Sequence, residues 1–174
     1  ASPALRRKRW LNSFNVSSEK MLAFAQRLAS WQPKVIIGYA SSLQLFASFL
    51  KENGLDGIHP VAVESSAEKL WDFQRTLVED VFDCPVFNVY GSREFGPLAA
   101  ECDRHTGLHA FTDLHVIEIV RDNQPVTDGE LGEVLVTNLT NFAMPLIRYQ
   151  IGDLARLTSA TCGCGRGFPL LSEI

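Results

Sequence analysis

The first 90 residues alternate short apolar runs with longer amphipathic segments, and this alternation constrains the fold more than any other feature. The apolar runs cover residues 34–38, 60–64 and 85–90. Between them, apolar residues recur at helical spacing in segments that begin near Ser17, near Ser41 or Ser42, and at Ser65. Strands separated by helices form βαβ units, so we expect an α/β fold with a mostly parallel sheet in this part.

The start of the third helix is predicted from a capping pattern. Ser65 is followed three residues later by Glu68, and such a pair can satisfy two of the free backbone N–H groups at a helix start. The apolar residues that follow have helical spacing, which predicts a helix from Ser65 onward.

The pattern changes after about residue 96. Residues 115–120 alternate with period two, 133–137 form another apolar run, and 145–149 and 153–157 are two further strand candidates. Short strands with turn residues between them indicate an antiparallel sheet or a small barrel, and we expect a small antiparallel, barrel-like β subdomain. We therefore divide the chain into an α/β subdomain, residues 1–96, and a β-rich subdomain, residues 97–174.

Composition excludes several classes of partner. The chain has 174 residues, a net charge of −4, 46% hydrophobic and 21% charged residues, which is ordinary for a globular protein. All five lysines precede residue 70, and the basic run 6–9 is interpreted as a solvated segment, so no nucleic-acid partner is expected. No apolar run is long enough for a membrane span, and the basic start lacks the apolar core of a secretory signal, which favours a cytoplasmic location.

The loop 88–96 directly follows a buried strand, at the edge where parallel sheets bind ligands. There Tyr90 offers a flat surface for stacking, Gly91 allows close approach of the backbone, and Glu94 is a carboxylate that can face a metal ion. The alternative is an ordinary loop bounded by glycines, with a surface glutamate.

Three segments together suggest a family. Residues 88–96 resemble the Y-G-x-T-E motif of the adenylate-forming enzymes, the acyl-CoA synthetase superfamily, and 143–153 resemble its later R-Y-x-x-G-D motif. Residues 65–70 stand where that superfamily has a G-A-E-P-L-like turn. The phrase 139–148 is especially similar to the phenylacetate–coenzyme A ligase branch, which includes capsule-biosynthesis relatives.

The resemblance implies roles for individual residues. Tyr90 would stack on adenine, Asp153 would accept hydrogen bonds from the ribose hydroxyls, and Glu94 would help hold Mg²⁺ as a catalytic residue. Arg148 would support the α-phosphate or position Asp153, with a surface salt bridge as the alternative. Arg93 replaces a usual Thr or Ser and is a good phosphate partner in its place. The remaining nucleotide-binding residues would be Ser66, Ala67, Glu68, Asn88, Gly91 and Ser92.

The implied activity belongs to a larger protein. It would join a small carboxylic acid to AMP from Mg·ATP and pass the acyl group to a thiol, with coenzyme A as the expected acceptor. The superfamily's glycine-rich phosphate loop is absent, and no lysine follows Lys69, so this central fragment is predicted to be inactive alone. The alternatives are a non-catalytic, zinc-stabilised nucleotide-binding module and an adenylating enzyme of capsule or secondary metabolism that does not use coenzyme A. A homodimer is left open.

The cysteines predict a second site. Cys162 and Cys164 lie one residue apart on a glycine-rich turn, and Cys102 and His109 could complete a Cys₃His set that binds structural zinc. His105 could substitute for His109. The alternative is that the turn is merely glycine-rich and its thiols are free.

Overall fold

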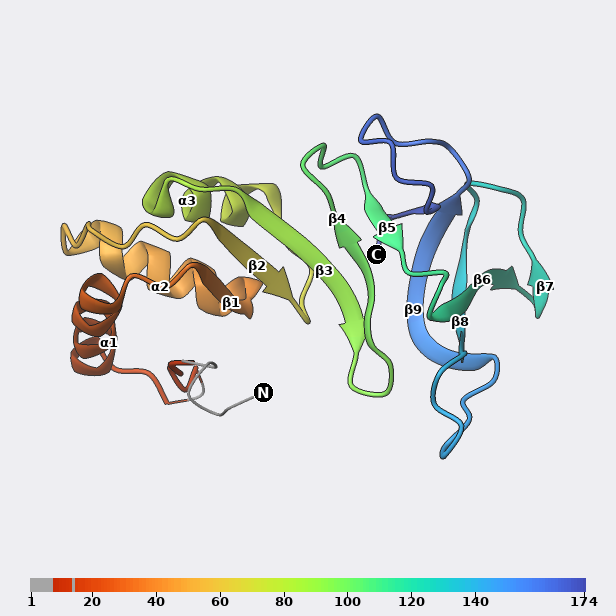
Figure 1. Cartoon of the computed structure of the whole chain (residues 1–174), viewed down its shortest axis with the longest axis horizontal. Helices are drawn as coiled ribbons and strands as arrows, with labels where there is room; N and C mark the ends of the chain where they lie inside the picture. Colours follow the sequence, from red (N-terminus) through yellow and green to blue (C-terminus); the bar gives the residue numbers. More distant parts are fainter. Residues whose placement is uncertain (1–7, 14) are drawn as a thin grey trace.

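The computed structural model describes residues 8–13 and 15–174, and its strands form one ten-stranded sheet (Figure 1). The order across the sheet is β1-β2-β3-β4-β5-β10-β9-β8-β6-β7. The strands are β1 (Val35–Tyr39), β2 (Ala62–Ser66), β3 (Val86–Ser92), β4 (Gly96–Glu101), β5 (Leu108–Ala110), β6 (His115–Arg121), β7 (Gln124–Pro125), β8 (Leu131–Asn138), β9 (Tyr149–Thr158) and β10 (Leu170–Ser172). Of the basic run 6–9, Arg6 and Arg7 lie outside the described residues.

The parallel part of the sheet contains β1, β2 and β3, and three helices accompany it. They are α1 (Ser18–Trp31), α2 (Ala40–Glu52) and α3 (Asp72–Phe82). Ile36, Val63 and Val86 are neighbours in the sheet and pack with the apolar sides of these helices in one core. The predicted βαβ arrangement is therefore confirmed, and each strand lies within two residues of its predicted position.

The opposite face of the edge strand β1 is exposed. On β1 the side chains of Val35, Ile37 and Tyr39 are 49%, 61% and 38% exposed. The intervening Ile36 packs against the core instead, as the period of two requires. Parallel sheets normally have both faces covered, whereas β1 leaves three apolar or aromatic side chains in contact with solvent.

The antiparallel part begins at β4, which pairs with β3 and continues the same sheet. A second core lies here, with Leu98, Val134, Val136 and Leu171 fully buried. The expectation of a barrel-like β subdomain is corrected: the described strands form one open sheet. The reason is the β3–β4 hairpin, which adds the antiparallel strands to the edge of the parallel sheet instead of starting a separate one.

The third helix begins later than predicted. Ser65 and Ser66 end β2, and α3 begins at Asp72 after a loop. The side chain of Gln74 accepts the backbone N–H of Trp71 at 3.0 Å, so the capping function lies six residues further along than the Ser65–Glu68 pattern indicates. Likewise, the predicted strand 145–149 is mostly loop, and β9 begins only at Tyr149.

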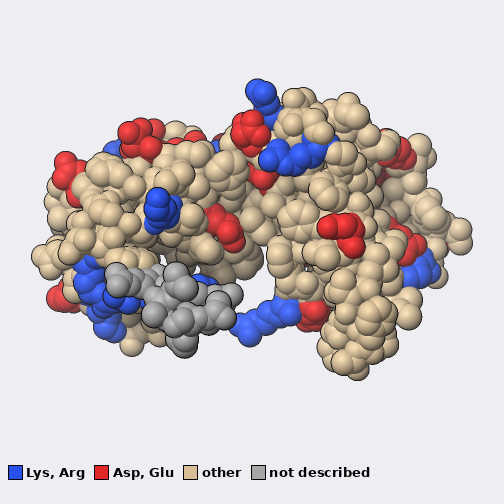
Figure 2. All heavy atoms as spheres, viewed as in Figure 1, with Lys and Arg blue, Asp and Glu red and all other residues tan. Residues whose placement is uncertain are grey.

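Charged side chains are spread over the surface. On the face shown in Figure 2, Lys and Arg lie at several separate places and most densely around α1. No helix among the described residues has the length and apolar character needed to cross a membrane.

Candidate functional site

The carboxyl ends of the parallel strands lie at one edge of the sheet, and most of the predicted nucleotide-binding residues are there. Ser65 pairs with Asn88 and Ser66 with Val89, so the 66–68 loop and the second half of β3 lie side by side. Ligands bind outside the carboxyl ends of strands in open α/β sheets. The two turns predicted from separate segments therefore form one surface.

Tyr90 and Asp153 contact each other directly. The Tyr90 hydroxyl on β3 donates a hydrogen bond of 2.8 Å to Oδ2 of Asp153 on β9. Tyr90 is half-buried, and burial raises the pKa of its hydroxyl well above the ordinary value, with a further contribution from Asp153. The hydroxyl is therefore a donor at neutral pH, and an aromatic ring and a carboxylate lie side by side.

Glycine at position 91 is required by the close approach of the β3 and β4 backbones in the hairpin. A Cβ atom at Gly91 would lie 2.2 Å from the carbonyl oxygen of Gly96 and 2.9 Å from Cα of Pro97. The β3–β4 register shifts between Tyr90 and Gly91, which is the mark of a bulge. This bulge sets the direction of the hairpin tip that carries Arg93 and Glu94.

Arg93 and Glu94 are both exposed at the tip of the β3–β4 hairpin. The pKa of Glu94 is lowered, first by the Ser92 hydroxyl, then by its own backbone amide, and also by the charge of Arg93. Glu94 is thus an ionised, accessible carboxylate, which is the kind of ligand that Mg²⁺ takes together with substrate phosphates.

Glu68 makes its contacts with α2. Its carboxylate accepts the backbone N–H of Ser41 at 2.8 Å and the Ser41 hydroxyl at 3.0 Å. A carboxylate here satisfies a free N–H of the first helical turn and lies at the positive end of the helix dipole. The contact anchors the 66–68 loop, in which Ala67 has a left-handed φ of 65°.

Arg148 lies in the loop before β9. Its Nε atom is 3.2 Å from Oε2 of Glu118 on β6, and its backbone N–H donates to the Thr137 hydroxyl at 2.9 Å. Its φ of 47° is in the left-handed region, which is uncommon for a residue with a side chain. The ion pair is the one named above as the alternative to a phosphate contact.

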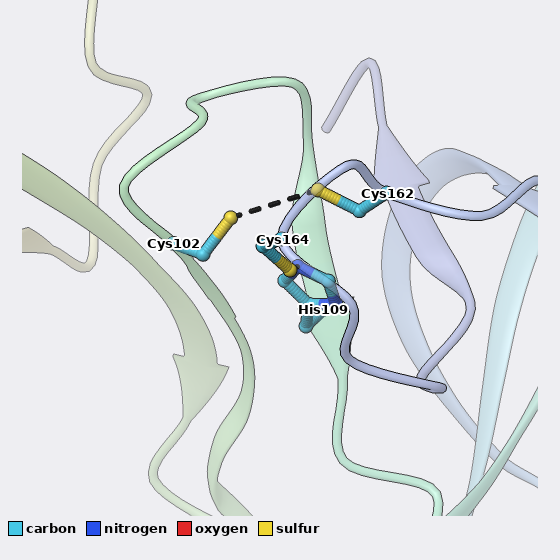
Figure 3. A group of neighbouring side chains, drawn as sticks. All are labelled: Cys102, His109, Cys162 and Cys164. Atoms are coloured by element: carbon cyan, nitrogen blue, oxygen red, sulfur yellow. Dashed lines mark hydrogen bonds between the residues drawn. The ribbon is translucent and has the colours of Figure 1, made fainter.

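The Cys₃His set comes together as a buried cluster. Cys102 follows β4, His109 is on β5, and Cys162 and Cys164 lie on the turn after β9 (Figure 3). Their ligand atoms all lie within 4.8 Å of one another. The Sγ atoms of Cys102 and Cys162 are 3.7 Å apart, and Sγ of Cys164 is 3.3 Å from Nε2 of His109.

These distances fit a tetrahedral metal ion. Two thiolates bound to zinc at about 2.3 Å lie roughly 3.8 Å apart, close to the observed separation. The backbone N–H groups of Arg104 and Arg166 donate to Cys102 and Cys164, at 3.4 and 3.5 Å. The Arg166 contact is the largest cause that lowers the pKa of Cys164, to about 6, whereas burial raises the pKa of Cys102.

His105 does not join this cluster. Its ring stacks on Phe87 of β3 with centroids 5.3 Å apart, and Nδ1 lies 3.2 Å from Oε2 of Glu101. His109 is therefore the histidine that lies among the cysteines.

Two charged residues near the site were not predicted from the sequence. Arg75 of α3 makes two hydrogen bonds to the carboxylate of Glu101, at 2.8 and 2.9 Å. Glu101 also accepts the backbone N–H of Asn88 at 2.8 Å. Because these residues are far apart in the chain, no local pattern signals their contact.

Comparison with known proteins gives a consistent set of similarities, although no protein-family model matches. The chain is 28% identical over 148 residues to "Protein CapK" of Staphylococcus aureus, an alignment that covers 84% of this chain. It is 31% identical over 147 residues to the phenylacetate-coenzyme A ligase of Thermus thermophilus, which covers 80% of this chain. The chain spans about a third of the length of these relatives, 32% and 33%.

A solved structure shares the fold. An open conformation of 2-hydroxyisobutyryl-CoA ligase, in complex with 2-HIB-AMP and CoA, superposes with a TM-score of 0.82 at 20% identity. The match covers 90% of this chain and 36% of that one. The arrangement of a parallel part continued by antiparallel strands is thus shared over nearly the whole chain.

Proposed function

The chain belongs to the adenylate-forming ligase superfamily, in the branch of phenylacetate-coenzyme A ligase and CapK, and on that basis we propose that it supplies the nucleotide site of an acid–thiol ligase. The whole protein would adenylate a carboxylic acid with Mg·ATP. It would then transfer the acyl group to a thiol, with coenzyme A as the acceptor.

The observation that carries this proposal is the contact between Tyr90 and Asp153. An adenosine needs an aromatic surface for its base and an acceptor for two vicinal hydroxyls on its ribose. A half-buried tyrosine ring beside an exposed carboxylate offers both within one nucleoside's reach. The 66–68 loop and Asn88, in the neighbouring strand ends, would edge the base.

The chemistry needs charge stabilisation at the α-phosphate. The substrate carboxylate would form a bond to the α-phosphorus while the bond to pyrophosphate breaks, and the thiol would later displace AMP from the acyl carbon. Glu94 would hold Mg²⁺, which would neutralise phosphate charge. Arg93 and Arg148 would add positive charge, and Arg148 would have to leave Glu118 to do so.

We further propose that these 174 residues bind nucleotide without completing adenylation. The sequence has no glycine-rich phosphate loop and no lysine after Lys69, and the developing charge on the phosphates needs such groups. The observation that tests this is pyrophosphate exchange, which the isolated chain should not support although it binds AMP.

The cysteine cluster is proposed to hold a structural zinc ion. Cys102, His109, Cys162 and Cys164 would be its ligands, and together they would tie the turn after β9 to the β4–β5 connection. Four protein ligands leave no open position, which is typical of structural sites. Zinc-bound thiolates and ATP as substrate would both be consistent with a cytoplasmic location, which is part of this proposal.

The proposed function is tested by measuring AMP and ATP binding by calorimetry. Asp153→Ala should abolish measurable binding, because the ribose would lose its acceptor. Asp113→Ala, which removes an exposed carboxylate in a different turn, is the matched control and should bind like the wild type. Equal binding by all three chains would refute the proposed nucleotide site. The acyl acceptor is tested separately, by supplying coenzyme A and amines to the whole protein and identifying the product.

A further inference from the structure

Strand β3 extends beyond the end of its partner β4. Val89 is opposite Ala100, and β4 ends one residue later at Glu101, so the first residues of β3 have no strand on that side. Backbone N–H and C=O groups that lose a strand partner need another one, since an unpaired buried group is costly.

Three charged side chains occupy this edge. Glu79 of α3 accepts the N–H of Val86 at 3.0 Å, Arg75 donates to the carbonyl oxygen of Val86, and Glu101 accepts the N–H of Asn88 at 2.8 Å. We call Arg75, Glu79 and Glu101 the β3 edge clamp. Its members replace the missing strand at the residues that lead directly to Tyr90.

The edge clamp is held together by its own charges. Nη2 of Arg75 lies within hydrogen-bond distance of both carboxylate oxygens of Glu101, at 2.8 and 2.9 Å, and a hydrogen bond between two charged groups is stronger than one between neutral groups. The side chain of Glu101 is only 9% exposed and that of Arg75 21%, so solvent screens the pair less than at an open surface.

The edge clamp is also continuous with the cysteine cluster. Glu101 directly precedes Cys102, and the turn that follows brings the His105 ring onto Phe87 of β3. The segment 101–105 therefore contacts β3 through a carboxylate and an aromatic ring, and one of its residues is in the cluster.

We propose that Arg75 and Glu101 are positioning residues for the nucleotide site and that a metal ion at the cysteine cluster stabilises their arrangement. This inference rests on the proposed function for its ligand, AMP, but not for the clamp itself. Glu101 fixes the backbone at Asn88, and Asn88 and Tyr90 are the β3 residues that would meet the base. A metal ion that fixes Cys102 would also restrict its neighbour Glu101, which holds the backbone N–H of Asn88 by a hydrogen bond.

The clamp is tested first without nucleotide, by amide hydrogen exchange in the zinc-loaded chain. Glu101→Gln keeps the size of the side chain and removes its charge. The rate of amide exchange at Asn88 should rise by roughly tenfold, because its N–H would lose the protection given by a hydrogen bond to a charged group. Val136, in the other core, should exchange as before. Unchanged exchange at Asn88 would overturn the clamp.

The positioning role is tested by AMP affinity at a temperature well below unfolding. Glu101→Gln should raise the dissociation constant for AMP by roughly tenfold. The matched control is Glu173→Gln, which breaks another ion pair, Arg156–Glu173 at 2.7 Å, and should leave AMP affinity unchanged. Raised exchange at Asn88 with unchanged AMP affinity would overturn the positioning role.

The link to the metal is tested with Cys162→Ser, which removes a ligand far from Glu101 in the chain. Exchange at Asn88 should rise in this variant and in the wild type after chelation, and chelation should add little to Glu101→Gln. Unchanged exchange at Asn88 in Cys162→Ser would overturn the link. If the wild-type chain bound no AMP, the proposed function would fail, and the exchange measurements would still decide the clamp.

Discussion

The hydroxyl of Tyr90 donates a hydrogen bond of 2.8 Å to Asp153, across 63 residues of chain. In the proposed site the ribose hydroxyls need the same carboxylate, so a bound nucleotide must share it with the phenol or displace it. The ring and the hydroxyl of Tyr90 therefore have separate roles in the proposed site, and substitution separates them.

We expect Tyr90→Phe to bind AMP within about threefold of the wild type, because the stacking surface remains. Tyr90→Ala should weaken binding by roughly tenfold or more, since stacking of a base on an aromatic ring contributes about 1–3 kcal/mol. Calorimetric titration with AMP measures both. A loss in Tyr90→Phe as large as that in Tyr90→Ala would contradict the stacking role.

One zinc ion per chain is expected by elemental analysis. Chelation should lower the midpoint of thermal unfolding by roughly 10 °C, because metal binding energy at a structural site is folding energy. Cys164→Ser should lose the metal, whereas Cys84→Ser should keep it, because Cys84 lies outside the cluster. A metal-free wild-type protein of undiminished stability would refute the site.

Stability should fall in mild acid because of His115. This side chain is only 3% exposed and lies edge-on to Phe95, and burial lowers its pKa below the ordinary value of 6.5. The unfolded chain therefore binds the proton more readily, and stability is lost as pH falls below 6.5. His115→Leu should reduce the slope of unfolding free energy against pH there by up to about 1.4 kcal/mol per unit. Urea denaturation at several pH values measures it, and an unchanged slope would contradict the assignment.

Gly91→Ala should destabilise the chain by about 2 kcal/mol or more, because the added methyl overlaps the Gly96 carbonyl and the hairpin must shift. Gly167→Ala is the matched control, since its Cβ meets nothing within 4 Å. The control should stay within about 0.5 kcal/mol of the wild type in urea denaturation. Equal effects of the two substitutions would show that the hairpin tolerates a side chain.

Glu68→Ala should cost about 1 kcal/mol of stability, the usual effect of losing a side-chain partner at a helix start. Glu52→Ala, at the other end of α2, removes an equally exposed carboxylate and should change little. Chemical denaturation of the two variants checks this. If Glu68→Ala were neutral, its contact with Ser41 would not hold the loop.

Local patterns predicted the parallel half well, because continuous apolar runs such as 34–38 and 85–90 indicate buried strands whichever strands they pair with. Strand β4 was missed because Gly96–Glu101 has no alternation, and it is a strand only because it pairs with β3 in a hairpin whose register shifts at Tyr90 and Gly91. That pairing also explains why the antiparallel strands extend an existing sheet.

In the candidate site, too, local residue patterns were predictive, whereas contacts that depend on packing were not. The Cys₃His set was predicted from its residue types, and the structure brings those four residues together. Glu68 was assigned to the wrong helix, because a capping pattern in sequence does not say which free N–H group a carboxylate will meet. Arg75 and Glu101 carry no local signal, since their pairing depends on how α3 packs beside β3.

Strand β3 belongs to both halves of the molecule, pairing with β2 on one side and β4 on the other. A cut between the halves would therefore separate two hydrogen-bonded strands instead of opening a linker. Each piece would be left with a bare strand edge, which readily recruits other chains. Either half expressed alone is therefore expected to aggregate, because β3 contributes residues to both hydrophobic cores.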